Sequence, residues 1–120
     1  MRLKSNAEIL RFATSVSVEK NVRLSTAMCA IFVSLVQLFA KEAGFDEERG
    51  LYFVQYSCRE FADIFHFSLR MIYVAFQKLD DCGLIERVPV KKDFRVLKGE
   101  VVSVNKPMVT YLDLSLFVEE

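Results

Sequence analysis

Apolar residues recur at intervals of three and four between residues 26 and 43, the spacing of one face of a helix. The repeating positions are Met28, Ile31, Phe32, Leu35, Leu38 and Phe39. Ser25 precedes the run as an N-cap and Gly44 follows it as a stop signal. Because the apolar stripe is wide, we expect this helix to lie across the core.

Two shorter helices separated by a tight turn are predicted further along. Ser57 and Glu60 have the spacing of a capping box and open the first helix, and Ser68 caps the second. The pattern breaks between them at His66-Phe67, and Cys82-Gly83 ends the second helix. The expected buried face of the second helix consists of Ile72, Ala75, Phe76 and Leu79.

Extended segments flank these helices. Residues 51–56 are rich in aromatic and branched side chains and predict a strand. Residues 84–90 and 101–105 predict two more strands, joined by a polar loop over residues 91–100. Pro89 has no N–H to donate to a ladder, so the first of these two strands should lie at a sheet edge.

The two ends of the chain are less regular. In the tail, residues 110–117, an alternating pattern places Leu112, Leu114 and Leu116 on one face, as in a strand that covers the core or pairs with a second subunit. Near the N-terminus, Ser5 and Glu8 predict the start of a short helix. The alternation over residues 12–18 predicts an extended segment instead, and the sequence leaves both interpretations open.

Length and composition favour one domain. The chain has 120 residues, of which 52% are hydrophobic, enough for one core without metal or disulfide staples. No apolar run reaches the roughly 20 residues needed to span a bilayer. The first residues lack the apolar stretch of a signal peptide. We therefore expect a cytoplasmic protein that does not enter a membrane.

Residues that carry catalytic or metal chemistry are sparse. Cys29, Cys58 and Cys82 are far apart and form no C-x-x-C pair, so neither a metal site nor a disulfide is expected. His66 is the only histidine, and Ser17 to Lys20 match the S-x-x-K pattern without its partner motifs. The sequence has no Gly-rich phosphate loop and no H-E-x-x-H motif. We therefore expect neither an enzyme nor a bound cofactor.

The predicted order of helix, strand, helix, turn, helix and hairpin is that of a winged helix-turn-helix, an α+β fold with three or more helices and a small antiparallel sheet. Residues 57–88 resemble bacterial regulators of this fold. The telling features are Phe61-Ala62-Asp63, Ser68 and the run from Leu79 to Arg87 that leads into the wing. Small Ala62 lets the two helices cross closely, and Gly83 permits a left-handed turn.

A narrower resemblance spans about residues 12–117. The Leu24-Ser25 start, the long apolar helix, the acidic loop with Asp46-Glu47 and the strand from Leu51 to Val54 are similar to the N-terminal DNA-binding domain of RepA-type plasmid replication initiators of Gram-positive bacteria. The resemblance implies binding of a homodimer to repeated origin sites, with a further C-terminal domain.

The predicted elements divide the single domain, residues 1–120, into three parts. Residues 24–105 are expected to form the winged-helix core. Residues 1–23 would be an N-terminal arm, and residues 106–120 a C-terminal extension.

In winged helices the second helix of the pair enters the major groove of double-stranded DNA. With Ile72 buried, helical spacing places Arg70, Val74 and Gln77 on the opposite face. Arg70 would pair with guanine, Gln77 with adenine, and Val74 would contact a thymine methyl group. The flanking candidates, at phosphates or beside them, are Ser68, Tyr73 and Lys78. Asp80 and Asp81 would repel phosphate at the far end of the helix.

The overall charge gives no support to DNA binding, because 16 basic residues balance 16 acidic ones. Any attraction for phosphate must come from local clusters. The predicted wing holds such a cluster, consisting of Lys91, Lys92, Arg95 and Lys98. These cations would clamp the DNA backbone, or they belong to a solvated loop diluted by Asp93 and Glu100; both alternatives stay open.

Two functions fit these features. The first is sequence-specific binding of double-stranded DNA in plasmid replication initiation or transcriptional regulation. The alternative is a winged helix that binds a protein partner and no DNA. The neutral net charge, the acidic helix end, and Met71 and Val74 on the expected outer surface favour the alternative.

Overall fold

The computed structural model describes residues 2–90, 93–104 and 107–119. Its helices are α1 (Asn6–Glu19), α2 (Thr26–Glu42), α3 (Cys58–Phe65) and α4 (Leu69–Asp81), with a short 3-10 helix η1 (Leu114–Phe117). Its strands are β1 (Arg2–Leu3), β2 (Gly44–Asp46), β3 (Leu51–Val54), β4 (Glu86–Val88), β5 (Asp93–Leu97), β6 (Glu100–Val104), β7 (Val109–Leu112) and β8 (Val118–Glu119). The class is α+β, as predicted.

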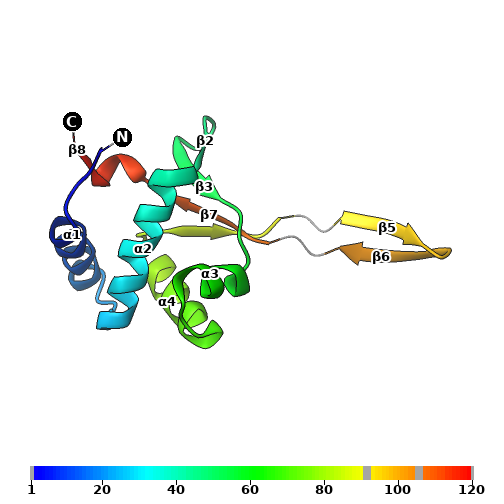
Figure 1. Ribbon diagram of the computed structural model, residues 1–120, viewed down its shortest axis with the longest axis horizontal. Helices are drawn as coiled ribbons and strands as arrows, with labels where there is room; N and C mark the ends of the chain where they lie inside the picture. The colour runs from blue at the N-terminus through cyan, green and yellow to red at the C-terminus, as the bar shows by residue number, and fades with distance from the viewer. Residues whose placement is uncertain (1, 91–92, 105–106, 120) are drawn as a thin grey trace.

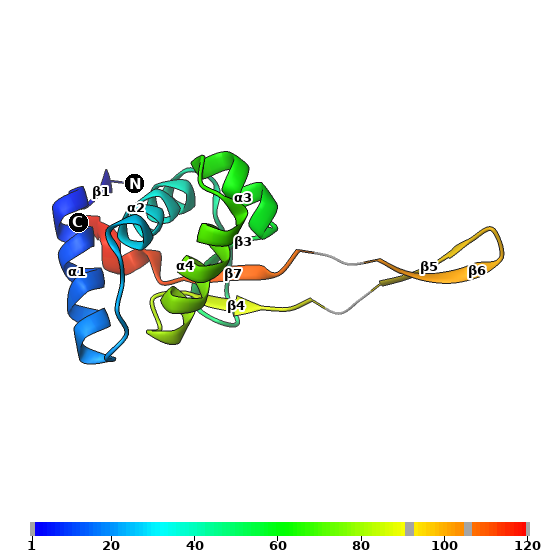
Figure 2. The same ribbon diagram turned by 90° about the horizontal axis from the view of Figure 1, so that it is seen from below.

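Four strands form one antiparallel sheet in the order β2-β3-β7-β4. The remaining strands pair as β1 with β8 and as β5 with β6. In Figures 1 and 2, α2 lies in the centre of the body, with α1 on one side and α3 and α4 on the other, and the β5–β6 hairpin projects away from the body. Within the described residues no helix is long and apolar enough to cross a membrane.

Helix α2 is the centre of the core, as its wide apolar stripe predicted. Ile31, Phe32, Leu35 and Val36 on this helix are fully buried. The predicted face of α4 is also confirmed, because Ile72, Ala75, Phe76 and Leu79 are all at most 1% exposed.

The predicted helix caps are present. The Ser25 hydroxyl accepts a hydrogen bond from the backbone N–H of Met28, and the Ser68 hydroxyl accepts one from Met71. Ser57 and Glu60 form the complete capping box, in which each side chain accepts from the backbone N–H of the other residue.

Replacement of Ser57 by alanine is expected to lower the free energy of unfolding by about 1 kcal/mol, because the Glu60 N–H loses its acceptor. In the structure that N–H lies 3.1 Å from the Ser57 hydroxyl oxygen. Equilibrium urea denaturation measures the loss. Ser57→Thr keeps a hydroxyl and should recover most of the stability. Equal stability of Ser57→Ala and the parent would contradict the capping role.

The open question near the N-terminus is resolved as a helix. Helix α1 starts after Ser5, whose hydroxyl accepts from the Glu8 N–H, and it runs through the residues that alternate in the sequence. Ile9 and Ala13 are fully buried, and Ser17 is 6% exposed with its hydroxyl donating to the carbonyl of Thr14. The alternation over residues 12–18 suggested a strand because the helical pattern is incomplete: the buried face of α1 includes the polar residue Ser17.

The predicted strand pairing after α4 is wrong. Strand β4 pairs with β7, whereas residues 101–104 belong to β6 and pair with β5. The expected polar loop over residues 91–100 is also wrong in its described part, because residues 93–97 form β5, which pairs with β6 in a hairpin with a turn at Lys98-Gly99. The sequence predicted a loop because β5 contains charged residues, which are more typical of loops. Strand β4 does lie at a sheet edge, directly before Pro89, as predicted.

The tail is part of the body. Leu112 ends β7, Leu114 and Phe117 are buried in η1, and Leu116 is 42% exposed, so the predicted single strand face is wrong beyond Leu112. The reason is that the chain turns into the 3-10 helix η1, in which Phe117 faces the core and Leu116 faces outward. The division of the chain at residues 23 and 105 stays a prediction, although both flanks supply core side chains.

The two pairs β4–β7 and β5–β6 have the same register. In both ladders the numbers of the paired residues add up to the same total, from Glu86 with Tyr111 to Leu97 with Glu100. Continued in that register, Pro89 would face Met108 and Val90 would face Pro107. Each of these two pairs lacks one N–H donor, which accounts for the end of the β4–β7 ladder at Val88 and Val109.

Candidate nucleic-acid interface

The outward face of α4 carries the predicted contact residues. Arg70, Gln77 and Lys78 are exposed, Tyr73 is 58% exposed and Val74 is 37% exposed. Among the described residues, the side chains of Arg70, Tyr73, Gln77 and Lys78 make no hydrogen bond or salt bridge. These side chains are therefore available to a ligand.

The turn between α3 and α4 holds this face in place. His66 adopts the left-handed conformation, with φ of 59°, and its N–H donates to the carbonyl of Ala62. Phe61 of α3 meets Phe76 of α4 edge to face, with ring centroids 4.8 Å apart. Ala62 is 8% exposed, in agreement with its predicted place at the helix crossing. His66 thus serves the turn.

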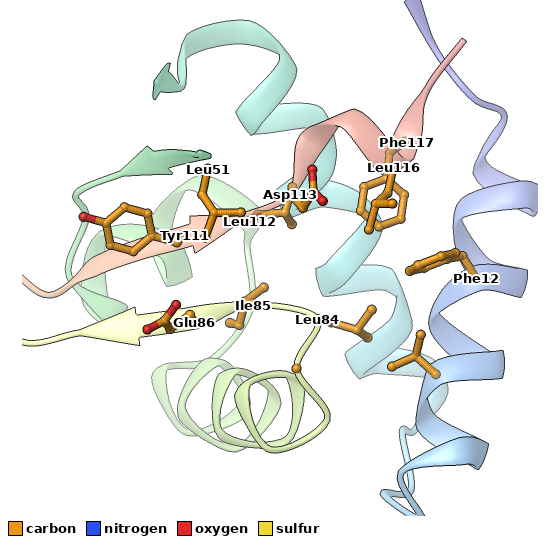
Figure 3. Close-up of a pocket in the computed structure, with 12 residues that line it drawn as sticks. Phe12, Leu51, Leu84, Ile85, Glu86, Tyr111, Leu112, Asp113, Leu116 and Phe117 are labelled. Atoms are coloured by element: carbon orange, nitrogen blue, oxygen red, sulfur yellow. The ribbon is translucent and has the colours of Figure 1, made fainter. Parts of the chain in front are cut away.

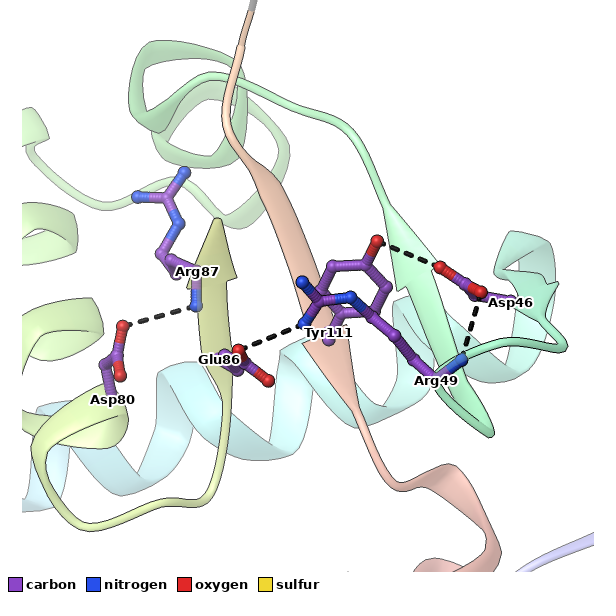
Figure 4. Close-up of polar contacts among 6 residues, drawn as sticks. All are labelled: Asp46, Arg49, Asp80, Glu86, Arg87 and Tyr111. Carbon is purple, nitrogen blue, oxygen red and sulfur yellow. Dashed lines mark hydrogen bonds and ion pairs between the residues drawn. The ribbon is translucent and has the colours of Figure 1, made fainter. Parts of the chain in front are cut away.

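One residue near this face lies elsewhere than predicted, and another has an additional structural contact. Met71 is half-buried and packs against the core, so it does not belong to an outer surface. Asp80 accepts a hydrogen bond at 3.2 Å from the backbone N–H of Arg87, which ties the end of α4 to β4 (Figure 4). Asp81 is exposed beside it.

The predicted wing cations fall into three groups. Lys98 is exposed at the tip of the β5–β6 hairpin, where Lys98 and Gly99 have φ angles of 52° and 80°. Arg95 lies in β5 and is paired with Val102. Lys91 and Lys92 lie outside the described residues. The positive φ angles are typical of a two-residue turn that joins twisted strands.

The sequence interpretation missed Arg59. It is exposed in the first turn of α3, directly after the cap formed by Ser57. In a helix-turn-helix the first helix crosses the DNA backbone. A cation next to a helix N-cap was the signal that pointed to this position.

Arg49 is occupied within the protein. Its Nη1 lies 3.0 Å from Glu86 Oε1, and its guanidinium carbon lies 4.5 Å from the ring centre of Tyr111 (Figure 4). The hydroxyl of Tyr111 donates to Asp46 Oδ2 at 3.1 Å. Burial, and then the bond to Asp46, raise the pKa of Tyr111 above its ordinary value. The hydrogen bond to Glu86 raises the pKa of Arg49, so the guanidinium stays protonated and remains paired with the Glu86 carboxylate.

A small apolar cavity lies between α1, the start of β4 and η1 (Figure 3). Its volume is about 210 Å3, and its lining includes Phe12, Val16, Leu84, Ile85 and Leu116. Pockets for small ligands usually measure roughly 300–1,000 Å3. This cavity is smaller than that range.

Cys29, Cys58 and Cys82 are free thiols. Burial raises the pKa of the Cys29 and Cys82 thiols, which keeps them in the unreactive protonated form. Within the described part of the chain, no three His, Cys, Asp or Glu side chains are grouped as metal ligands.

Comparison with known proteins places the fold. No protein-family model matches the sequence, and no curated protein matches it. Two solved structures are similar, "N-Terminal domain of DNA binding protein" and "Structure of Rep-DNA complex". The first is 22% identical, with a TM-score of 0.53 over 81% of this chain and 68% of that chain. The second is 21% identical, with a TM-score of 0.53 over 82% of this chain and 69% of that chain.

The chain has a winged helix-turn-helix fold. In this fold, α3 and α4 form the helix-turn-helix, with α4 as its second helix. We call the β5–β6 hairpin, Asp93–Leu97 and Glu100–Val104, the wing.

Proposed function

We propose that this winged helix binds double-stranded DNA in a sequence-specific manner, with α4 in the major groove. The observation that carries the proposal is the outward face of α4, where Arg70 and Gln77 are exposed and unpaired among the described residues. These are the side-chain types that read guanine and adenine. Val74 lies between them, exposed enough to contact a thymine methyl group.

The flanking residues would hold the DNA backbone. The proposed phosphate contacts are Ser68, Tyr73, Lys78, Lys91, Lys92, Arg95 and Lys98, and we include Arg59 because it is exposed in the first turn of α3. The Ser68 hydroxyl accepts from the Met71 N–H, so its own proton is available to a phosphate oxygen.

Fluorescence anisotropy with labelled duplexes from the native replicon tests the proposal across a salt series. If the four wing cations contact phosphates, log Kd should change with log salt with a slope of about 3.6. Lys20→Ala, which removes an exposed cation at the end of α1, is the matched control and should leave the slope unchanged. Equal, salt-independent binding to all duplexes would exclude the proposal.

The biological setting we propose is plasmid replication initiation, with transcriptional regulation as the other use of the same site. One of the similar structures is a Rep-DNA complex, which supports the first. Protection of repeated origin segments in a footprint would distinguish it from protection of a promoter.

A homodimer would fit repeated or palindromic sites. Leu10 and Val18 lie on the outer side of α1 and are 36% and 75% exposed, which supplies an apolar surface for a second copy. Analytical ultracentrifugation of the parent and of Val18→Glu measures the oligomer. A parent that stays monomeric on DNA would exclude the dimer.

One observation favours a protein partner as the second candidate function. Tyr73 and Val74 are adjacent and exposed at the centre of α4, where an aromatic and an aliphatic side chain would also suit a protein interface. Pull-down from the native host, with nuclease added, should then recover a partner that Val74→Glu loses. Loss of the captured protein upon nuclease treatment would mean that DNA mediated the capture, which would favour DNA binding by this surface.

Replacement of Lys98 by asparagine is expected to stabilise the wing and weaken DNA binding. Asparagine tolerates the left-handed conformation at φ of 52° better than lysine does. Amide hydrogen exchange should therefore slow in β5 and β6, while the salt slope falls by about 0.9. Lys98→Gln removes the charge without helping the turn and separates the two effects. An unchanged salt slope in both variants would mean that Lys98 does not contact the DNA.

A further inference from the structure

We infer that Arg87 is a positioning residue that fixes the wing relative to α4, so that the two DNA-contacting elements act as one unit. The inference rests on the proposed function. Arg87 lies in β4, at the base of the hairpin that continues into the wing, and its side chain faces the helices while Glu86 faces the other side of the sheet.

The guanidinium of Arg87 joins three elements. Its Nε donates to Thr110 Oγ1 of β7 at 3.2 Å, and Thr110 is fully buried. Its Nη1 donates to the Sγ of Cys58, the first residue of α3, at 3.0 Å. Its guanidinium carbon lies 5.1 Å from the ring centre of Phe76, on the buried face of α4.

The backbone of the same residue adds a fourth connection. The Arg87 N–H donates to Asp80 Oδ2 in the last turn of α4 (Figure 4). Arg87 therefore links both strands at the base of the wing to both helices of the helix-turn-helix. No other described residue makes contacts of this kind to all four elements.

The described ladder at the base of the wing is short, with three residue pairs, so the contacts of Arg87 are a large share of what holds this base to the helices. The β4–β7 ladder ends at Val88 and Val109, and the described residues next to them include Pro89 and Pro107. Strand β5 alone, five residues at roughly 3.3 Å each, spans about 17 Å of the wing. A rotation of about 10° at the base would therefore move the tip by at least about 3 Å, enough to lose a phosphate contact.

A double-mutant cycle on DNA tests the coupling. The variants are Arg87→Met, Lys98→Ala and their combination, measured by anisotropy over a salt series. In the parent background, Lys98→Ala should lower the salt slope by about 0.9. In the Arg87→Met background, the same change should lower it by less than half of that, because the wing no longer reaches its phosphate at a fixed position.

Arg49→Met is the matched control. Like Arg87, Arg49 has a hydrogen-bond partner and an aromatic ring beneath its guanidinium, but the partner is the Glu86 carboxylate and the ring is that of Tyr111, on the sheet face away from α3 and α4. In that background Lys98→Ala should keep its full effect. Arg87→Lys, which keeps a cation near Phe76 and one donor, should restore part of the coupling.

The outcomes separate the inference from the proposed function. A parent protein without salt-dependent DNA binding would overturn both. An effect of Lys98→Ala that is equal in the parent and Arg87→Met backgrounds, with both proteins folded by circular dichroism, would overturn the role of Arg87 alone. If Arg87→Met does not fold, Thr110→Val and Cys58→Ala each remove one partner of the guanidinium, and full Lys98 effects in both would overturn the inference.

Discussion

Replacement of Arg70 by alanine should weaken binding to the preferred duplex by about 5- to 150-fold, the range expected for a lost bidentate contact to guanine. Arg70 is exposed in the first turn of α4, and among the described residues no partner holds its guanidinium. The loss should be small on unrelated duplexes, because the contact reads a base. Anisotropy competition with duplexes substituted at single positions measures the effect.

Two variants define the control for Arg70. Arg70→Lys keeps the charge but loses the planar pair of donors, so it should recover phosphate attraction without base discrimination. Lys78→Ala should weaken all duplexes to a similar degree, because a phosphate contact carries no sequence information. Equal losses on preferred and unrelated duplexes for Arg70→Ala would contradict base reading by this residue.

Replacement of Phe117 by alanine should lower the free energy of unfolding by about 3–5 kcal/mol, the usual cost of emptying a phenylalanine site in a core. Phe117 is 2% exposed and meets Phe12 and Phe32 edge to face, with ring centroids 5.2 Å and 5.5 Å apart. Domains of this kind are stable by only about 5–15 kcal/mol, so the change should be visible as a large shift of the urea midpoint.

The neighbouring Leu116 supplies the matched control. It belongs to the same short helix but is 42% exposed, so Leu116→Ala should change stability by less than about 1 kcal/mol. Phe117→Leu should cost less than Phe117→Ala because it leaves a smaller cavity. Similar stabilities of Phe117→Ala and Leu116→Ala would mean that the tail does not belong to the core.

The helices α2, α3 and α4 could be predicted because their signals are local. Each has a serine at its N-cap, and the apolar spacing that follows agrees with the buried face. The partner of β4 could not be predicted in the same way. Strand pairing joins distant segments, and 20 residues separate Val88 from β7. Two charged residues in β5 and the turn at Lys98 were also typical of a loop.

For the candidate site, helical spacing was enough to place Arg70, Val74 and Gln77 on one exposed face. It was not enough to tell which cations are occupied inside the protein. Nothing in the sequence distinguishes Arg49 and Arg87 from Arg70. Their partners in the structure come from distant strands and helices. The roles of the predicted DNA-contacting residues stay predictions, which the variants above test.

Because the β4–β7 and β5–β6 ladders have the same register, the length of the wing can be changed in defined steps without a change of strand pairing. Removal of two facing pairs, Arg95 with Val102 and Val96 with Val101, would keep the turn and the alternation of the strands. Each such deletion would draw the tip in by about 6–7 Å, close to the rise of two base pairs. In a complex of the proposed kind, a series of shortened wings should move one boundary of the protected DNA stepwise while the bases read by α4 stay the same.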